Sequence, residues 1–218
     1  MPTLAIVGAG PGMGLAIART FGRNGFHVAL VARNQGKLTA LVAQLEEEGI
    51  TAAGFTADVS DRPSLVAAFD AVKARFGPVD VLEFSPANPA LPFATPTEVS
   101  IANLQPQIDF YIYGAITAVE QVLPDMLARG SGTLLFTTGG SSINPAPMFA
   151  NIGIATAGLR NWVYSLHAAL AEHGIQAAHI AISAWIGQQP GAEPEKIASL
   201  YWELYTQRDQ VERHFLAS

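Results

Sequence analysis

A glycine-rich turn near the start of the chain is the feature that most constrains its fold. The apolar run 4–7 stops at Gly8, and a second apolar stretch begins at Leu15 after three more glycines. This order predicts a buried strand, a tight turn and a helix whose N-terminus faces the turn. Backbone N–H groups and the positive end of the helix dipole meet there, which suits a phosphate group. We therefore expect the turn to hold a dinucleotide diphosphate through Gly8, Gly10, Pro11, Gly12, Met13 and Gly14.

The spacing of these glycines differs from the widespread G-x-G-x-x-G pattern. Counted from Gly8, the last glycine of that pattern falls on Met13, and counted from Gly10 it falls on Leu15. The pattern that fits is G-x-x-x-G-x-G, for which a purely structural turn is the alternative interpretation. Its position at the first strand-to-helix junction favours the nucleotide.

Composition narrows the class of protein. The 218 residues suffice for one domain, 1–218, and the absence of cysteine excludes disulfides and thiolate metal sites. The net charge is −6 and the 12 basic residues are scattered singly, so no nucleic acid partner is expected. The first residues show neither a signal peptide nor a membrane segment, so a cytoplasmic location is expected. Half of the residues are apolar and only 14% are charged, which predicts that some apolar surface lies between subunits.

Apolar runs rich in Val, Ile and Leu alternate with helical patterns along the chain. This alternation predicts a single-domain α/β fold of the Rossmann type, a doubly wound parallel sheet with helices on both faces. Strands are expected at 3–7, 27–32, 51–56, 79–84, 132–137 and 176–182. Helices are expected at 13–24, 35–48, 62–75, 100–128, 151–172 and 194–206. Four prolines between 86 and 96 predict a stiff loop at the carboxyl edge of the sheet, and a short strand near 215–216 is left open.

The end of the second predicted strand bears on which nucleotide binds. This strand ends in Arg33 and Asn34, where dinucleotide folds usually have an acid that binds the ribose hydroxyls. A guanidinium there can bind a 2′-phosphate, which favours NADP over NAD; a solvated arginine is the alternative. After the third strand, Asp58 can accept a hydrogen bond from the adenine amino group while Val59 packs on the ring. Asp58 or Ser60 could also start the following helix.

Several short segments, taken together, resemble the short-chain dehydrogenase/reductase family from residue 4 to about residue 206. They are G-A-G-P-G-M-G at 8–14, V-A-R-N at 31–34, A-D-V-S-D at 57–61, V-D-V-L at 79–82, L-P-D-M at 123–126, G-T-L-L at 132–135, H-G-I-Q-A-A at 173–178 and P-E-K-I-A at 194–198. The resemblance implies NAD(P)-dependent carbonyl or alcohol chemistry. It also implies a homodimer or homotetramer built through the two long helices at 100–128 and 151–172. Ser85, Pro86 and Ala87 stand in the family's N-N-A-G segment and are expected to bind the cofactor.

The catalytic residues of that family are absent at the matching positions. The family uses a serine, a tyrosine, a lysine and an asparagine, and the lysine is needed because a phenol with an unperturbed pKa of about 10 is a poor base at neutral pH. The four positions carry Gly139, Ile152, Thr156 and Tyr111. No Y-x-x-x-K occurs elsewhere in the sequence. The resemblance therefore implies a divergent member with a degenerate catalytic tetrad.

Two functions are compatible with this sequence. The first is an NADP-dependent oxidoreductase of unknown substrate with a relocated proton donor. Tyr111 is the catalytic candidate, Tyr113 is a second, and Thr138, Ser141 and Arg160 could assist, although packing explains the tyrosines and an ion pair explains the arginine. The second is an NADP(H)-binding protein without turnover, either a sensor or an inactive subunit. A third possibility is that no nucleotide binds, so whether the chain is an enzyme is open at this point.

The remaining histidines and aromatic residues predict no further site. The five histidines lack metal-ligand spacing, so no metal site is expected. Only eight residues separate Trp185 from Pro194, too few for a long substrate lid. Core or subunit packing is the favoured interpretation of six aromatic residues that could also shape a pocket, namely Trp162, Tyr164, Trp185, Tyr201, Trp202 and Tyr205.

Overall fold

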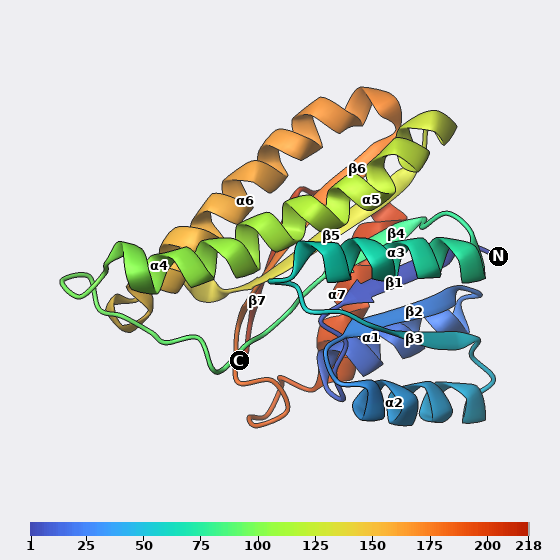
Figure 1. Cartoon of the computed structure of the whole chain (residues 1–218), viewed down its shortest axis with the longest axis horizontal. Coiled ribbons are helices and arrows are strands. Elements are labelled where there is room, and N and C mark those ends of the chain that lie inside the picture. Colours follow the sequence, from blue (N-terminus) through green and yellow to red (C-terminus); the bar gives the residue numbers. More distant parts are fainter. Residues whose placement is uncertain (218) are drawn as a thin grey trace.

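A sheet of seven parallel strands forms the centre of the molecule (Figure 1). The computed structural model describes residues 1–217. The strand order is β3-β2-β1-β4-β5-β6-β7, so the predicted doubly wound parallel sheet is confirmed. The strands are β1 (Thr3–Val7), β2 (His27–Ala32), β3 (Ala52–Thr56), β4 (Val81–Phe84), β5 (Gly132–Gly139), β6 (Ile175–Ser183) and β7 (Glu212–Leu216).

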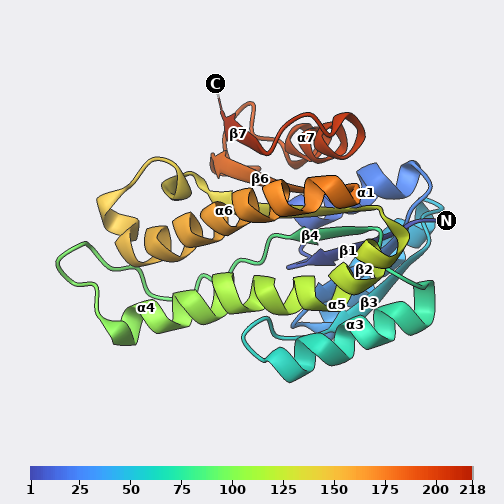
Figure 2. The same cartoon turned by 90° about the horizontal axis from the view of Figure 1, so that it is seen from above.

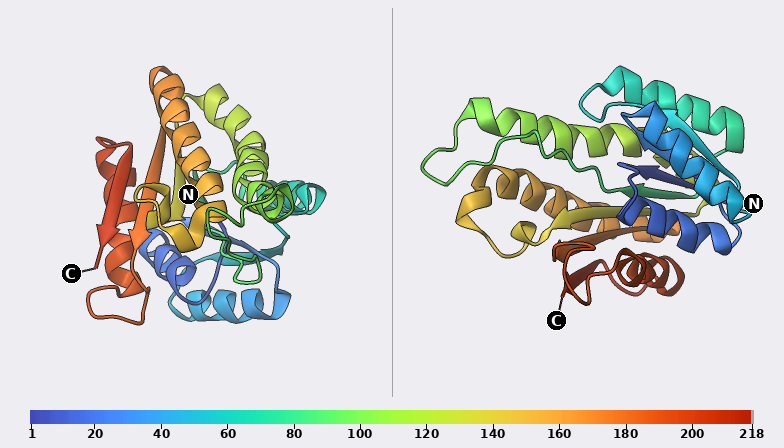
Figure 3. Two further views of the ribbon diagram at one scale, coloured as in Figure 1. Left: turned by 90° about the vertical axis from the view of Figure 1, so that its left-hand side faces the viewer. Right: turned by 90° about the horizontal axis from the view of Figure 1, so that it is seen from below.

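Helices join the strands and cover both faces of the sheet (Figure 2). The long helices are α1 (Met13–Arg23), α2 (Gln35–Glu47), α3 (Arg62–Phe76), α5 (Gly114–Arg129), α6 (Ala150–Leu170) and α7 (Pro194–Gln207). The short ones are α4 (Ile101–Gln107), the π-helix η1 (Ile108–Tyr113) and the 3₁₀ turns η2 (Gly140–Ser142), η3 (Pro147–Phe149) and η4 (Ala171–His173). Helices α1, α2 and α7 pack on one face, and α3, α5 and α6 pack on the other, as the two views of Figure 3 also show.

Burial on both faces explains why most strand positions are apolar. Successive side chains of a strand point to opposite faces. In β1, Leu4 and Ile6 join the core under α1 and α7, whereas Ala5 and Val7 join the core under α3 and α5. A polar residue at either set of positions would be taken out of water, so the sequence shows continuous apolar runs rather than alternation.

An aromatic cluster fastens α7 to α1. Phe21 lies edge-on to Phe26 and to Trp202, with ring centroids 5.2 Å apart in both pairs, and Tyr205 is 5.4 Å from Phe26. Tyr201 of the same helix is fully buried. Core packing is confirmed for Tyr201, Trp202, Tyr205 and Trp162, whereas Tyr164 is 37% and Trp185 69% exposed.

The helical run after the proline-rich loop differs from the single helix expected at 100–128. It consists of α4, the π-helix η1 and α5 in direct succession. Pro106 lies inside α4 and has no N–H to donate to the carbonyl of Ala102, which weakens the α-helical ladder just before η1. A π-helical turn contains one residue more than an α-helical turn, and this segment carries Tyr111.

The sheet also gains a strand that the sequence left open. β7 pairs in parallel with β6, with Ala181 opposite His214. Three polar residues, Glu212 to His214, interrupt the apolar pattern there and hide the strand from a hydrophobicity argument. Elsewhere the predicted strand ends are displaced by a few residues, since β3 and β4 begin later and β5 and β6 extend further toward the carboxyl edge.

Helix α3 begins at a residue that the sequence analysis did not consider. Asp61 is its N-cap and accepts a hydrogen bond from the backbone N–H of Ser64 at 3.3 Å. The Asp58 carboxylate accepts from the N–H of Ser60 at 2.9 Å, inside the preceding turn. The interpretation of Asp58 or Ser60 as the helix start is therefore wrong, because the N-cap is Asp61 and the first helical residue is Arg62.

Gly174 offers a test of the packing at the amino edge of the sheet. Its φ is +69°, and a Cβ added there would lie 2.4 Å from the carbonyl oxygen of Gly130. Gly49 has a similar φ of +76° but no neighbouring atom within 4 Å. We expect Gly174→Ala to lower the free energy of unfolding by about 1 kcal/mol more than Gly49→Ala, whose loss reflects the positive φ alone. Urea unfolding measures both values, and equal losses would contradict the close contact.

Candidate active site

The carboxyl edge of the sheet is hollowed beside the glycine turn. β1 and β4 are neighbours, and the chain leaves them in opposite directions, toward α1 and toward the proline-rich loop. Parallel sheets bind ligands at such a reversal of strand order. A space of about 460 Å³, here called the turn cavity, opens there. Its walls include the glycine turn, residues 85–87 after β4, Tyr111 and residues 137–139 at the end of β5.

The glycine turn fits a diphosphate. Gly8 has a φ of +99°, and a Cβ there would lie 2.4 Å from the Cα of Pro86, so only glycine allows this approach. A Cβ at Gly10 or Gly12 would meet no atom within 4 Å, so these residues border open space. Gly12 caps α1 without a side-chain hydrogen bond, and the first turn of α1 contains no acid. The N–H groups at the start of α1 are thus open to an anion.

A second space, here called the basic cavity, continues from the turn cavity toward β2. Its volume is about 290 Å³, and it shares Gly8, Gly10, Pro86 and Ala87 with the turn cavity. Arg33 and Lys37, both exposed, line its outer part, and Val59 lines it as well. Asn34 caps α2 by accepting a hydrogen bond from the Lys37 N–H at 2.9 Å, which brings the lysine beside the arginine. Two cations therefore lie where the sequence predicted one.

A third space, here called the aromatic cavity, lies on the other side of Tyr111. Its volume is about 570 Å³, and it shares Tyr111, Gly139, Ile182 and Ala184 with the turn cavity. Among the described residues, none that lines it is charged. The other residues of its wall are Phe93, Gly140, Ser141, Asn144, Ala146, Phe149, Ile152, Ser183, Trp185 and Gln189.

The buried amide of Asn151 fixes the proline-rich loop against this cavity. Its Nδ2 donates to the carbonyl oxygens of Pro92 and Asn103, at 2.9 and 3.0 Å. Its Oδ1 accepts from the N–H of Ala94 at 3.0 Å. Phe93 is thereby held edge-on to Phe149, with ring centroids 4.8 Å apart.

The structure brings three of the four family positions together at the aromatic cavity. Gly139, Ile152 and Tyr111 line it, whereas Thr156 is buried and donates its hydroxyl to the Ile152 carbonyl at 2.8 Å. Burial raises the pKa of Tyr111 to about 12, the opposite of what a proton-transferring phenol needs. Tyr113 points elsewhere, since the Arg62 guanidinium lies 4.8 Å from its ring centroid and the side chain lines neither cavity.

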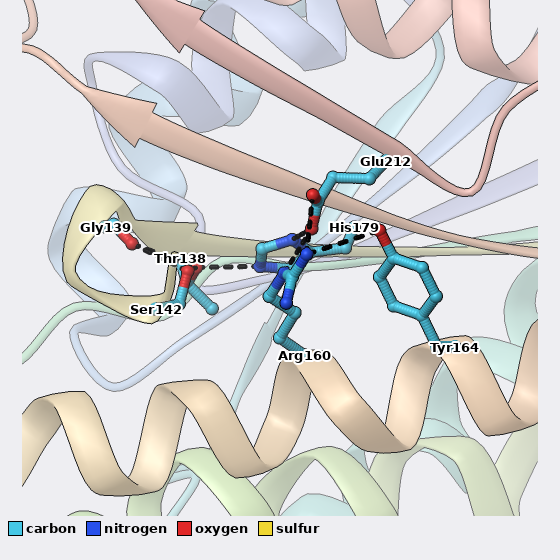
Figure 4. Close-up of polar contacts among 7 residues, drawn as sticks. All are labelled: Thr138, Gly139, Ser142, Arg160, Tyr164, His179 and Glu212. Atoms are coloured by element: carbon cyan, nitrogen blue, oxygen red, sulfur yellow. Dashed lines mark hydrogen bonds and ion pairs between the residues drawn. The ribbon is translucent and has the colours of Figure 1, made fainter. Parts of the chain in front are cut away.

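Arg160 takes part in a polar network that fastens β7 to the sheet (Figure 4). Its Nε and Nη2 bind the Glu212 carboxylate at 2.5 and 2.9 Å. The same carboxylate is 2.8 Å from His179 Nδ1, and His179 Nε2 is 2.8 Å from the Thr138 hydroxyl. The ion-pair interpretation of Arg160 is therefore confirmed, and the Thr138 hydroxyl is engaged inside the protein.

The charges of this network follow from its surroundings. Burial raises the pKa of Glu212, but the hydrogen bonds from Arg160 and His179 outweigh it and lower that pKa to about 2. Burial lowers the pKa of His179, and the nearby carboxylate only partly offsets this effect. At neutral pH the network is thus a carboxylate between a guanidinium and a neutral imidazole, which accepts the Thr138 proton at Nε2.

A second buried network lies under the turn cavity. Glu83 of β4 is fully buried, and its two oxygens accept from the Ser85 hydroxyl at 2.8 Å and from the Thr137 hydroxyl at 3.0 Å. Thr137 is also 2.7 Å from the Tyr201 hydroxyl. Burial raises the pKa of Glu83 to about 8, and the two hydroxyl donors only partly offset it. Glu83 is thus mainly a neutral acid at pH 7.

Sequence reasoning missed several of these residues. Glu83 has a local signal, a single acid inside the apolar run V-L-E-F. Lys37 has a weaker one, since it lies in the first turn of the helix predicted at 35–48, four residues after Arg33. Ser183 and His214, whose side chains meet at 2.8 Å beside the aromatic cavity, have none, because they lie on different strands.

No helix within residues 1–217 combines the length and the apolar character needed to cross a bilayer. Over the same residues, no three side chains of His, Asp or Glu are grouped so that they could hold a metal ion.

Glu83 predicts a specific pH dependence of stability. Its pKa is raised on folding from 4.5 to about 8, so its stabilising contribution is complete below pH 4.5 and is lost as the pH rises through 8. Between about pH 6 and pH 9, wild type should lose roughly 2 kcal/mol of unfolding free energy that Glu83→Gln retains. Urea unfolding at both pH values measures this difference, with the exposed Glu120→Gln as control. Parallel pH dependence in wild type and Glu83→Gln would refute the assignment.

Comparisons with known proteins place this architecture in a family. The sequence profile of short chain dehydrogenases matches residues 2–185. The chain is 30% identical over 203 residues to 3beta-hydroxysteroid dehydrogenase 1 of Eggerthella lenta, covering 90% of this chain and 77% of that protein. A Streptomyces coelicolor relative that carries the name of a ketoacyl reductase is 33% identical over 152 residues, or 67% of this chain, and the match spans 58% of its length.

A solved structure agrees with these relatives. A metagenomic short-chain oxidoreductase in complex with NADP has 25% sequence identity and a TM-score of 0.85, and the match covers 100% of this chain and 97% of that chain. The parallel sheet, the glycine turn at its reversal point and the extent of the profile match agree with one another. The chain belongs to the short-chain dehydrogenase family.

Proposed function

We propose that this protein is an NADP(H)-dependent oxidoreductase that acts on an uncharged carbonyl compound or alcohol. The observation that carries the proposal is the continuity of the three cavities. An open glycine turn lies between a cavity with two cations and a cavity without charged lining, and neighbouring cavities share wall residues. A dinucleotide with an extra phosphate suits the first two cavities, and its substrate suits the third.

We assign a separate set of residues to each part of the cofactor. Arg33, joined by Lys37, would bind the 2′-phosphate, and Val59 would pack on the adenine with Asp58 beside it. The diphosphate would lie over the glycine turn, and residues 85–87 would border the ribose of the nicotinamide half. When bound, the nicotinamide supplies or accepts the hydride. The full proposed set is Gly8, Gly10, Pro11, Gly12, Met13, Gly14, Arg33, Lys37, Asp58, Val59, Ser85, Pro86 and Ala87.

Binding without turnover is the second candidate. It is favoured by Gly139 and Ile152, which place no acid in the aromatic cavity, and by the raised pKa of Tyr111. Loss of general acid–base assistance alone costs roughly 10² to 10⁴ in rate. The two candidates agree on the nucleotide and differ on turnover, so they are tested by separate measurements.

The choice of nucleotide predicts an effect confined to NADPH. Replacing Arg33 by Ala should weaken NADPH binding about tenfold or more and leave NADH binding unchanged, because only NADPH carries the 2′-phosphate. Titrations that follow nicotinamide fluorescence measure both affinities, with Arg75→Ala, which changes an arginine outside both cavities, as control. Equal losses for the two nucleotides would remove the NADP preference. No fluorescence change up to millimolar NADPH would remove both candidate functions.

The lining of the aromatic cavity predicts which compounds are reduced. With NADPH, uncharged aromatic ketones such as acetophenone and 1-tetralone should be reduced, because the cavity buries apolar rings. Keto acids such as pyruvate should not be reduced, because no cation in the cavity wall pairs with their carboxylate. The oxidation of NADPH followed by absorbance measures both. Tight NADPH binding with no oxidation over the panel would favour the non-enzymatic candidate.

Self-association is part of the same proposal. Figure 2 shows α4 to α5 and α6 lying side by side and extending beyond the sheet. Several large apolar side chains of these helices are exposed, among them Leu127 at 41% and Ile154 at 49%. A dimer or tetramer built through 100–128 and 151–172 would cover them. The cytoplasmic location likewise stays a prediction from the sequence.

A further inference from the structure

A hydroxyl group enters the aromatic cavity from a strand that has no catalytic residue in the family pattern. Ser183 is the last residue of β6, and β6 pairs with β5 so that Ile182 lies opposite Gly139. Ser183 therefore lies beside Gly140, and both residues line the aromatic cavity. A Cβ at Gly140 would be 1.8 Å from the Ser183 Oγ. The serine hydroxyl thus occupies the volume that any side chain at position 140 would fill.

The neighbouring Gly139 leaves space in front of this hydroxyl. A Cβ at Gly139 would meet no atom within 4 Å, so the position where the family has its serine borders open cavity. Two consecutive glycines therefore do two things. Gly140 admits the Ser183 side chain, and Gly139 keeps the adjacent volume free for a ligand oxygen.

The hydroxyl has a titratable partner behind it. His214 of β7 lies half-buried beside β6, and its Nε2 is 2.8 Å from the Ser183 Oγ. When Nε2 carries a proton it donates to Oγ, and the Ser183 proton is free to point into the cavity; when Nε2 is unprotonated, Ser183 donates to it. The protonation state of the imidazole thus decides whether Ser183 offers the cavity a proton or a lone pair.

We propose that Ser183 and His214 are the proton-exchanging pair of the aromatic cavity, with Ser183 contacting the reacting oxygen and His214 supplying or removing its proton through Ser183. This inference rests on the proposed function. In reduction, the carbonyl carbon accepts the hydride from NADPH and the carbonyl oxygen takes the Ser183 proton. Ser183 takes the Nε2 proton of the imidazolium, which ends neutral and regains a proton from solvent. Oxidation of an alcohol reverses each transfer.

Two other hydroxyl groups near the cavities are less suited to this role. Thr138 is 5% exposed, and its hydroxyl is engaged with His179 and Ser142, both at 2.8 Å. Ser85 lines the turn cavity and donates to Glu83, so it lies on the nucleotide side. Ser183 combines an exposed hydroxyl, a place on the substrate side and a titratable neighbour.

The test compares Ser183→Ala and His214→Gln with matched controls in single-turnover reduction of 1-tetralone by NADPH. Ser199→Ala removes an exposed hydroxyl of α7 that lines none of the three cavities, and His173→Gln removes an exposed imidazole. Both test variants should be slower by about 100-fold or more, with NADPH affinity within twofold of wild type. The double variant should be no slower than the slower single one, because the two residues act as a unit.

The pH profile separates proton transfer from a structural role of His214. The other titratable or charged groups of this neighbourhood are Glu212 on the same strand, His179 on β6 and Arg160 on α6. Reduction by wild type and by Ser199→Ala should quicken as the pH falls, because Nε2 of His214 must carry the proton that it passes to Ser183. His214→Gln should show no such rise.

Several results would overturn the inference. One is that Ser183→Ala or His214→Gln reduces 1-tetralone at a rate within threefold of the wild-type rate. Another is that the rate of His214→Gln depends on pH as the wild-type rate does. Binding of NADPH without reduction of any ketone would also overturn it, while leaving the nucleotide assignment intact. Failure to bind NADPH would overturn the proposed function as well. If His214→Gln does not fold, Ser183→Ala decides, since it removes one exposed hydroxyl only.

Discussion

Parallel pairing of every strand is the constraint on which the candidate site depends. Parallel strands need a crossover helix between them, so the carboxyl ends of the strands and the N-termini of the following helices meet at the same edge. Residues that follow different strands, such as Gly8 after β1 and Arg33 after β2, are thereby brought together at the basic cavity although they are far apart in the chain. The backbone at Gly8 must pass close to the backbone at Pro86, because β1 and β4 are neighbours at the reversal of strand order.

The carboxyl edge of the sheet also explains how a catalytic group can move from one strand to another without a change of fold. Ser183 ends β6 beside the end of β5, so a hydroxyl can reach the place next to Gly139 from either strand. His214 depends on β7, which is fastened by the charged network of Arg160 and Glu212 rather than by apolar packing alone. A charge-assisted pair of this kind is strong because it is partly shielded from water, and it fixes the register of the strand that carries the imidazole.

Much of the fold could be predicted from the sequence, because strands buried on both faces leave long apolar runs. The glycine turn could be predicted for a different reason. A positive φ and the close approach of the Pro86 backbone restrict position 8 to glycine. β7 could only be left open, as a short strand near 215–216, because the polar side chains of Glu212 and His214 find their partners on α6 and β6 and not in solvent. The relation of Ser183 to Gly140 is likewise a cross-strand contact that no local pattern encodes. The sequence could show only that the expected catalytic positions carry Gly139, Ile152 and Thr156.

The π-helical segment η1 has a consequence for how the cavity wall can vary between relatives. An α-helix turns by about 100° per residue, so one extra residue in a turn rotates the side chains of the preceding helix, α4, relative to those of the following helix, α5. In η1 this offset allows Gly114 to face Val59 while Tyr111 faces the two cavities. A relative that lacked one residue between 108 and 113 would keep the packing of α5 but present a different side chain to the ligand. Substrate preference could therefore change through the length of this segment, with no substitution in the wall itself.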